Sequence, residues 1–195
     1  MILPIVAYGD AVLRKVAVDI DKDYPNLSEL IENMRETMVN AQGVGLAAPQ
    51  IDKSIRLFIV NATPFGEDED LNEEERTFLS NFNKVFINAK ILKEEGEEWA
   101  FCEGCLSIPD IREDVFRQEK ITIEYLDENF EKHTDVLTGL AARVVQHEYD
   151  HIEGVLFIDK ISSLKKRLLK KKLENISKGK VNSDYRMVFP SIKRK

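Results

Sequence analysis

Two segments of the chain repeat their apolar residues with the period of an α-helix. In 27–41 apolar positions recur three and four residues apart, which predicts an amphipathic helix, and Gly43 beyond it is suited to end that helix in a left-handed conformation. The stripe consists of Leu27, Leu30, Ile31, Met34, Met38 and Ala41. A second helix is expected over 138–153, ending at Gly154. Four of its residues lie within about 40° of one another on the helix surface: Leu140, Val144, His147 and His151.

Between these helices the pattern is that of β-strands. Residues 55–61 are rich in β-branched and aromatic side chains, as in a buried strand, and 84–93 and 115–126 are also strand-like. The Asp-Glu-Asn sequence at 127–129 favours a hairpin turn, so 130–136 is expected to be the returning strand. Short strands grouped around two separated helices predict an α+β fold, with antiparallel-dominated sheets around the central helix that carries both histidines.

The remaining segments are strongly charged. Residues 66–76 are too acidic to be packed and are expected to form an exposed insertion. Residues 160–178 predict a last, lysine-rich helix with one apolar edge, which includes Ile161, Leu164, Leu168 and Ile176. We therefore expect a main domain over 1–162, and a basic C-terminal helix and tail over 163–195 that either belong to it or are appended to it.

The composition is that of an ordinary globular protein. The 195 residues are 43% apolar and 32% charged, which suits one domain with a sizeable core. No apolar run approaches the roughly 20 residues that a membrane-spanning helix needs, and the N-terminal segment lacks the basic region and cleavage site of a secretory signal. Two cysteines three residues apart give no disulfide framework. A cytoplasmic protein is the expectation.

The net charge of −7 conceals an asymmetry. Residues 160–195 contain 13 Lys and Arg against 2 Asp and Glu, a balance of +11, so the rest of the chain carries −18. A basic segment on an acidic body suggests a tail that meets a polyanion while the body repels one. A solvated basic helix would show the same pattern.

The strongest chemical signal is His147-Glu148-Tyr149-Asp150-His151, an H-E-x-x-H motif on a predicted helix. Histidines four residues apart project together and can bind one metal ion, while Glu148 beside them can transfer protons. Imidazoles on a core-facing stripe are costly unless their nitrogens have partners, which supports this interpretation. The third histidine, His133, is expected to be an exposed residue of the hairpin.

Two histidines do not complete a metal site, and Cys102 and Cys105 offer thiolates. If both bind, the site is a closed structural Cys₂His₂ tetrahedron; if one binds, a position stays open for water, as in a hydrolytic centre. Two features favour the open site: Glu148 has no task in a structural site, and about 40 residues separate Cys105 from His147, far more than in a zinc finger. A thioredoxin-like pair is disfavoured because no βαβ pattern surrounds the cysteines.

A third element is the glycine- and alanine-rich stretch at 43–50. It superficially matches the dinucleotide-binding fingerprint, but that fingerprint follows a strand and opens a helix, whereas this stretch follows a helix and runs into Pro49. The small residues instead describe backbone that another group approaches closely, with Gln50 supplying an amide. A simple helix-terminating loop is the alternative.

Together these elements resemble the peptide deformylases, whose motifs are G-x-G-x-A-A-x-Q, E-G-C-x-S and Q-H-E-x-D-H. In family order the chain has GVGLAAPQ at 43–50, EGCLS at 103–107 and QHEYDH at 146–151. The likeness extends to 4–15 and 154–162 and covers most of residues 1–170. The departures are the acidic insertion and the tail at 180–195; both lie outside the motifs and bear on surface and partners, not on chemistry.

The resemblance implies a hydrolase that removes the formyl group from the N-terminal formylmethionine of newly made polypeptides. Carried over position by position, it implies that Cys105, His147 and His151 bind one metal ion and that Cys102 does not. It also implies Fe²⁺ as the native metal, commonly replaced by Zn²⁺ or Ni²⁺ in preparations. A Cys/His/His set by itself would suggest zinc first.

The resemblance also assigns roles around the metal. Glu148 is expected to take a proton from the attacking water and return it to the departing amine. In the family the oxyanion is stabilised by the Gln50 amide and the backbone N–H of Leu106, and Gly45 keeps its loop close to the substrate backbone. An apolar pocket for the methionine side chain is expected from Val44, Leu140 and Val144. Glu103, Gln146 and Asp150 are expected to orient the ligands through hydrogen bonds.

The basic C-terminus has an implied partner as well. The resemblance implies that the last helix docks on ribosomal RNA near the exit tunnel, and neither a membrane nor DNA is expected as a partner. The charge comes from Lys165, Lys166, Arg167, Lys170, Lys171 and Lys172. Deleting 163–195 is expected to weaken ribosome binding and spare activity on short peptides, unless the helix is needed to cover the core.

Two other classes of protein remain open from the residues alone. One is a zinc peptidase of the H-E-x-x-H type, which would cleave internal peptide bonds and normally use His or Glu as third ligand. The other is a structural Cys₂His₂ module with a basic RNA-binding tail, which would have no activity.

Overall fold

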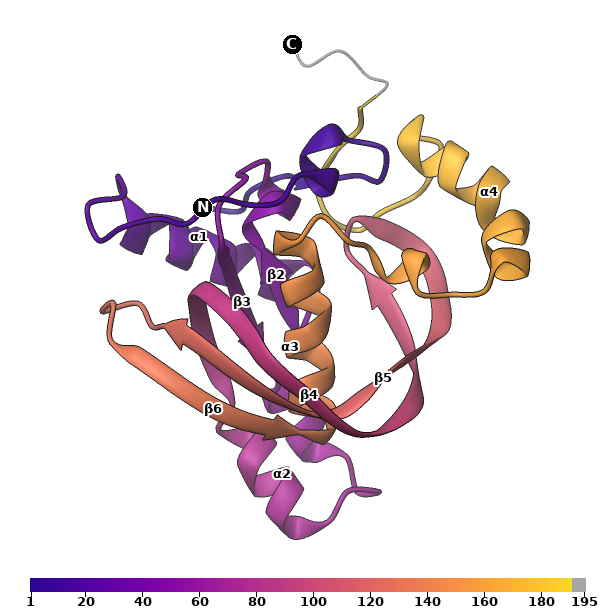
Figure 1. Ribbon diagram of the computed structural model, residues 1–195. Helices are drawn as coiled ribbons and strands as arrows, with labels where there is room; N and C mark the ends of the chain where they lie inside the picture. Colours follow the sequence, from indigo (N-terminus) through magenta and orange to yellow (C-terminus); the bar gives the residue numbers. More distant parts are fainter. Residues whose placement is uncertain (191–195) are drawn as a thin grey trace.

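The computed structural model describes residues 1–190 and shows a mixed α+β architecture around one central helix (Figure 1). That helix is α3, Gly139–Ile152. It packs against a five-stranded sheet in the order β2-β3-β4-β5-β6, in which all neighbouring strands are antiparallel. The strands are β2 Gly45–Ala47, β3 Leu57–Asn61, β4 Asn83–Cys105, β5 Ile108–Leu126 and β6 Lys132–Thr138. The expected fold class, with antiparallel pairing and a central helix, is confirmed.

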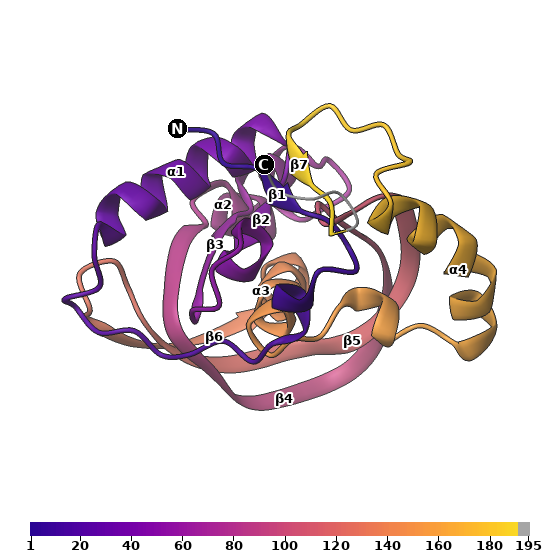
Figure 2. The ribbon, with the colours of Figure 1, turned by 90° about the horizontal axis from the view of Figure 1, so that it is seen from above.

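The other elements surround this centre. Helix α1, Leu27–Asn40, packs on the face of the sheet opposite to α3. Strand β1, Ile5–Val6, pairs in parallel with β7, Met187–Val188 (Figure 2). The remaining helices are α2 Glu73–Ser80 and α4 Ser163–Ser177. Four 3₁₀ turns complete the described chain: Ala11–Arg14, Ala48–Ile51, Thr63–Glu67 and Phe157–Asp159.

Helix α1 buries the stripe expected for it but does not end as expected. Its left-handed residue is Gln42, with φ of 54°, and not Gly43. The Gly43 N–H donates to the Met38 carbonyl at 2.9 Å, which closes the helix one residue earlier and places the left-handed conformation on Gln42. Gly43 instead gives room to Leu106, because a Cβ at position 43 would lie 2.8 Å from Leu106 Cδ1 and would require that side chain to shift.

The hairpin strands are longer than the sequence pattern indicates. We expected strands at 84–93 and 115–126, whereas β4 and β5 run on to meet at a two-residue turn, Leu106–Ser107. The charged stretch at 94–98 hid this continuation, which bulges around Gly96 with φ of +88°. The returning strand β6 also starts two residues later than expected, because Phe130, with φ of 60°, belongs to the turn.

The acidic insertion is exposed as expected at 67–70 but ends in a helix. The Asn72 side chain accepts the Glu75 N–H at 2.9 Å and caps α2. Glutamates in its first turn are favourable at the positive end of the helix dipole. Leu79 is buried and anchors α2 to the core.

Helix α4 packs through a different edge from the one expected. Ile161 and Ile176 are buried, but Leu164 and Leu168 are 65% and 72% exposed. The buried stripe is Leu169, Leu173 and Ile176, which recur at i, i+4 and i+7 and pack in one cluster with Val6 and Phe157. The C-terminal helix thus covers apolar residues from both ends of the chain.

Candidate metal centre

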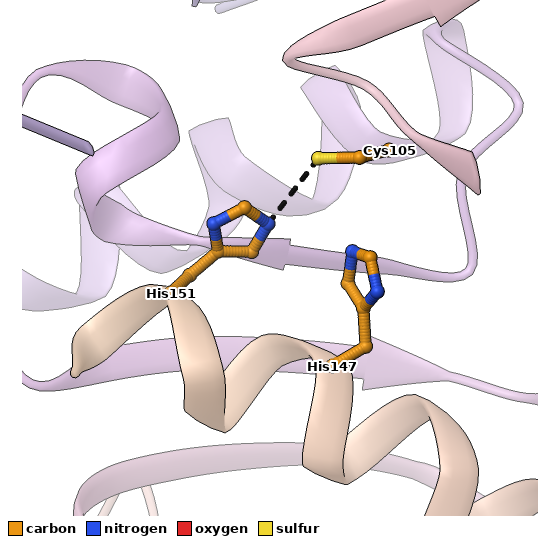
Figure 3. A group of neighbouring side chains, drawn as sticks. All are labelled: Cys105, His147 and His151. Atoms are coloured by element: carbon orange, nitrogen blue, oxygen red, sulfur yellow. Dashed lines mark hydrogen bonds between the residues drawn. The ribbon is translucent and has the colours of Figure 1, made fainter. Parts of the chain in front are cut away.

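Helix α3 and the end of β4 bring three metal-ligand donors together. His147 and His151 lie one helical turn apart on the face of α3 that looks towards the β4–β5 hairpin, where Cys105 ends β4 (Figure 3). The Cys105 Sγ, and one ring nitrogen from each histidine, all lie within 4.8 Å of one another. Cys105 Sγ is 3.3 Å from His151 Nε2. The sequence-based ligand set is therefore a spatial cluster.

The other cysteine is not part of this cluster. Cys102 and Cys105 are three residues apart in one extended strand, so their side chains point to opposite faces. Cys102 is exposed, and Cys105 is partly buried. The structure brings one thiol to the histidines, which leaves room for an open coordination position.

A buried carboxylate holds the first histidine. His147 Nδ1 lies 2.9 Å from Glu103 Oε2, and because a carboxylate only accepts, Nδ1 carries the proton and Nε2 is left free for a metal. Two arginines fix the carboxylate in turn: Arg117 donates to both of its oxygens, at 2.7 and 2.9 Å, and Arg143 donates to Oε1 at 3.0 Å. The expected role of Glu103 has a direct geometric basis.

Asp150 and Gln146 have different hydrogen-bond partners. Asp150 accepts a hydrogen bond from Arg117 at 2.6 Å, so it reaches His147 through Arg117 and Glu103. Gln146 instead donates to the backbone carbonyls of Gln118 and Ala142 at 3.0 and 3.2 Å. These bonds tie α3 to β5, so Gln146 supports the helix that carries both histidines.

Arg117 and Arg143 are residues that sequence reasoning missed. Arg117 lies at an inward position of the 115–126 alternation, and Arg143 lies next to the buried stripe of α3. Arg143 is only 2% exposed, donates to the carbonyls of Val115 and Trp99, and stacks 4.4 Å from the Trp99 ring centroid. The sequence offered one signal for both arginines: each places a charge at a position where the pattern of the strand or helix predicts a buried side chain.

The ionisable groups of the cluster are strongly perturbed. Burial raises the pKa of Glu103, but its hydrogen bonds from Arg117 and His147 outweigh this and hold it well below its usual range. Burial lowers the pKa of His147, but the neighbouring Cys105 and Glu103 outweigh it and raise the value to about 10. Burial lowers the pKa of His151 well below its usual range. The surroundings thus favour one positive charge between the thiol and Glu103.

Glu148 follows His147 and faces the loop at 43–50. It is 4% exposed, and its Oε2 has no hydrogen-bond partner among the described residues. Burial raises its pKa to about 7. A Cβ at Gly45 would collide with the Glu148 carboxylate, so glycine at 45 is what admits the carboxylate to the site.

Gln50 points its amide nitrogen into the same site. Its Oε1 accepts the Ala47 N–H at 2.8 Å, and since a backbone N–H can only donate, this bond fixes which end of the amide faces the cluster. Nε2 then lies 3.5 Å from Cys105 Sγ and 3.3 Å from Ser107 Oγ. Leu106 follows Cys105 directly, so its N–H borders the cluster as well.

The three expected pocket residues lie in one apolar cluster. Leu140 and Val144 are buried, on the turns of α3 that precede His147, and Val44 packs against the same cluster from the loop before β2. The three side chains therefore pack in one cluster, and two of them lie on the helix that carries both histidines.

His133, by contrast, lies on β6, and its Nε2 is 2.9 Å from Asp127 Oδ2 at the β5–β6 turn. With Glu131 these residues also bring three donors within 4.8 Å of one another. His133 is partly exposed at the hairpin, close to what we expected of it.

The donor set fits a divalent transition metal. One thiol and two imidazoles suit zinc, iron and nickel, and three protein ligands leave a fourth position for water or substrate. A site whose charges favour a proton on His147 also favours a cation that takes its place. Along residues 1–190, no helix is both long and apolar enough to cross a membrane.

The chain matches a family model and close relatives. The model described as "Polypeptide deformylase" matches residues 2–167. A peptide deformylase of Christiangramia forsetii is 66% identical over 194 residues, covering 100% of this chain and 99% of the relative. One from Flavobacterium psychrophilum is 65% identical and covers 100% of both.

Solved structures agree with these sequence matches. The crystal structure of a peptide deformylase from Legionella pneumophila is similar with a TM-score of 0.77 at 35% identity, over 92% of this chain and 98% of that one. Peptide deformylase 1B of Arabidopsis thaliana in complex with an inhibitor gives a TM-score of 0.77 at 33% identity, over 94% and 98%.

Proposed function

The chain belongs to the polypeptide deformylase family, metal-dependent hydrolases that remove the N-formyl group from nascent peptides, and we propose that Cys105, His147 and His151 hold its metal while Glu148 moves the protons. The observation that carries this assignment is the buried cluster of these three donors, with Glu148 beside His147 and the Gln50 amide nitrogen 3.5 Å from Cys105 Sγ. The metallopeptidase alternative would normally take His or Glu as third ligand, whereas here the third donor is a thiol.

We propose Fe²⁺ as the native ion, with Zn²⁺ or Ni²⁺ taking its place in preparations. A mixed thiolate and imidazole site accommodates all three ions. When bound, the metal supplies Lewis acidity, which polarises the formyl carbonyl and makes the attacking water more acidic. Glu103, fixed by Arg117 and Arg143, keeps His147 in the tautomer that can bind it.

Glu148 serves as base and then as acid. Its carboxylate takes the proton of the attacking water and returns it to the amine as the C–N bond to the formyl carbon breaks. A pKa of about 7 suits both steps at neutral pH, and a nearby cation favours the charged, proton-accepting form. The Glu148 carboxylate is buried beside Gly45, so the packing around it, and not bulk water, fixes its position.

Gln50 and Leu106 supply the oxyanion donors in this proposal. The Gln50 amide nitrogen and the Leu106 N–H border the cluster from the loop at 43–50 and from the β4–β5 turn. Both are set in place by the fold before substrate arrives, which is what makes such donors effective at a developing charge. Val44, Leu140 and Val144 are proposed to contact the methionine side chain of the substrate.

Gln50→Ala is expected to lower kcat by about 10²- to 10³-fold and to change KM much less, because an oxyanion donor acts mainly in the transition state. Steady-state kinetics on a formyl-Met peptide measures both constants. A variant that raised KM and kept kcat would show that Gln50 binds the substrate without stabilising the oxyanion.

We further propose that the protein works in the cytoplasm at the ribosome, where formylated chains emerge, and docks there through α4. Two of its cations have partners within the chain: Lys165 pairs with Glu113 at 2.7 Å, and Lys166 donates to the Asp159 carbonyl at 2.7 Å. The exposed remainder can meet phosphates: Arg167, Lys170, Lys171 and Lys172. The acidic α2 lies at the opposite end of the molecule from α4 (Figure 1), so repulsion there does not oppose this contact.

Substitution, not truncation, tests this docking. Deleting 163–195 would uncover the cluster in which Leu169, Leu173 and Ile176 are buried, so our expectation that the deletion spares peptide activity does not suit this structure. Reversing the charge of Arg167, Lys170 and Lys171 to Glu is expected to weaken ribosome binding by about tenfold or more at low salt, with less effect at high salt. Co-sedimentation with ribosomes measures this.

The matched control reverses three exposed lysines of the body, Lys15, Lys22 and Lys53, and so changes the net charge equally. It should retain more ribosome binding than the α4 variant. Equal losses from both variants would contradict docking through α4 and indicate a response to net charge alone.

A further inference from the structure

The tail that follows α4 returns to the active-site turn. After α4 the chain runs back across the molecule, and β7 pairs in parallel with β1, with Met187 opposite Ile5 and Val188 opposite Val6 (Figure 2). This small sheet joins the first residues of the protein to the last ones described. Strand β7 lies outside residues 2–167, which are the residues that the family model matches.

The flanks of this sheet hold two consecutive carbonyls of the turn between β4 and β5. The Tyr185 hydroxyl donates to the Leu106 carbonyl at 2.7 Å, and the Tyr8 N–H donates to the Ser107 carbonyl at 2.8 Å. Ser107 is also held from inside, since its Oγ lies 3.3 Å from Gln50 Nε2. The turn that directly follows Cys105 is therefore held from two sides.

The turn depends on these contacts because the strand ladder does not fix it fully. The β4–β5 register shifts between Gly104 and Cys105, immediately before the turn. At such a shift the ladder is locally disrupted, so the peptide groups that follow are oriented by whatever else they bond. The Leu106 carbonyl and the Leu106 N–H belong to the two rigid peptide units that meet at the Leu106 Cα. Holding the carbonyl fixes the unit after Leu106, and the strand end at Cys105 bounds the unit before it, so the φ and ψ rotations of Leu106 that set the direction of its N–H are restricted.

Tyr185 is built to make this bond. Its ring packs with Leu106 and Met187 against the cluster that also contains residues of α1 and β3. The Ser183 hydroxyl donates to the Tyr185 carbonyl at 3.0 Å, and its oxygen accepts the Tyr185 N–H at 3.3 Å. These two bonds fix the local backbone. Burial raises the pKa of Tyr185 to about 12, so the hydroxyl keeps its proton at neutral pH.

We propose that Tyr185 is a positioning residue, whose hydroxyl holds the Leu106 carbonyl so that the Leu106 N–H stays aimed at the substrate oxyanion. This inference rests on the oxyanion role proposed for Leu106. Tyr185 acts through the peptide backbone, and the C-terminal tail thereby becomes part of the machinery that orients the active site.

Tyr185→Phe tests the proposal by removing one hydroxyl and preserving the ring. We expect kcat on a formyl-Met peptide to fall by about 3- to 10-fold, as for the loss of one hydrogen bond that matters in the transition state, with KM changed by less than about twofold. Metal content should be unchanged. Amide hydrogen exchange followed by mass spectrometry should show faster exchange in the peptide that contains 105–108.

The control is Tyr125→Phe, which removes the hydroxyl of another packed tyrosine. The Tyr125 hydroxyl donates to Asp135 Oδ2 at 2.9 Å, at the β5–β6 hairpin. This variant should keep both kcat and exchange at 105–108. It separates a general loss of stability from loss of the contact with Leu106.

Wild-type kcat in Tyr185→Phe would overturn the proposal, as would a rise in KM alone or a fall in kcat matched by Tyr125→Phe. These outcomes differ from failure of the proposed function. If Gln50→Ala is slow and Tyr185→Phe is not, the oxyanion site stands and only the role of Tyr185 fails. If Gln50→Ala keeps wild-type kcat, the oxyanion assignment itself fails.

Discussion

Glu148→Gln is expected to lower kcat by about 10²- to 10⁴-fold, towards the upper end because Glu148 serves in two proton transfers. Glutamine has nearly the same size and shape as glutamate but can neither accept nor return the proton. Its side chain fits beside Gly45, where the glutamate is already buried. The variant should keep its metal, because Glu148 is not among the three clustered donors.

Two measurements check this expectation together. Elemental analysis gives metal per chain, and turnover of a formyl-Met peptide gives kcat. Glu153→Gln is a suitable control, since Glu153 caps the same helix and pairs with Arg56 at 2.7 Å instead of facing the donor cluster. If Glu148→Gln deformylated within a few-fold of wild type, another group would have to be the base.

Cys105→Ala is expected to abolish both tight metal binding and turnover. The substitution leaves two imidazoles four residues apart on α3, one ligand short of the three protein ligands that hold a catalytic metal with an open position. The control is offered by the chain itself: Cys102→Ser changes the other thiol, three residues away on the opposite face of β4, and should keep both metal and activity.

Metal content after dialysis, and activity on the formyl-Met peptide, distinguish the two possible sites. Loss of metal from Cys102→Ser would contradict the open site and favour a closed Cys₂His₂ centre. Metal retained at one equivalent by Cys105→Ala would require a third ligand outside the cluster.

The sequence carried the helical part of the site because those residues lie close together along the chain, whereas the choice of Cys105 over Cys102 came from the family resemblance. His147, Glu148 and His151 share one helix, so a spacing of four residues was enough to bring both imidazoles to one side of it. The exposed position of Cys102 follows in the same way from strand alternation once β4 is known to include it.

Elements of the fold were predictable where a pattern recorded burial on one side. The stripe of α1 and the alternation in β5 are of this kind. The pattern failed where exposed charge covered regular structure: the glutamates at 94–98 lie in a long strand, and those at 73–75 begin α2. Backbone hydrogen bonds form these elements, and side-chain hydropathy does not record such bonds.

What the amino-acid sequence determined by itself was thus the family and the α+β class, and it named Cys105, His147, His151 and Glu148 as the candidate site. Only the tertiary structure decided which distant groups support them. Arg117 and Arg143 around Glu103 come from different elements, and Tyr185 reaches Leu106 from 79 residues away. Which leucines of α4 are buried is likewise decided by the elements that the helix packs against. Local periodicity fixes how a residue faces within its own helix or strand, whereas contacts between elements depend on how the whole chain packs.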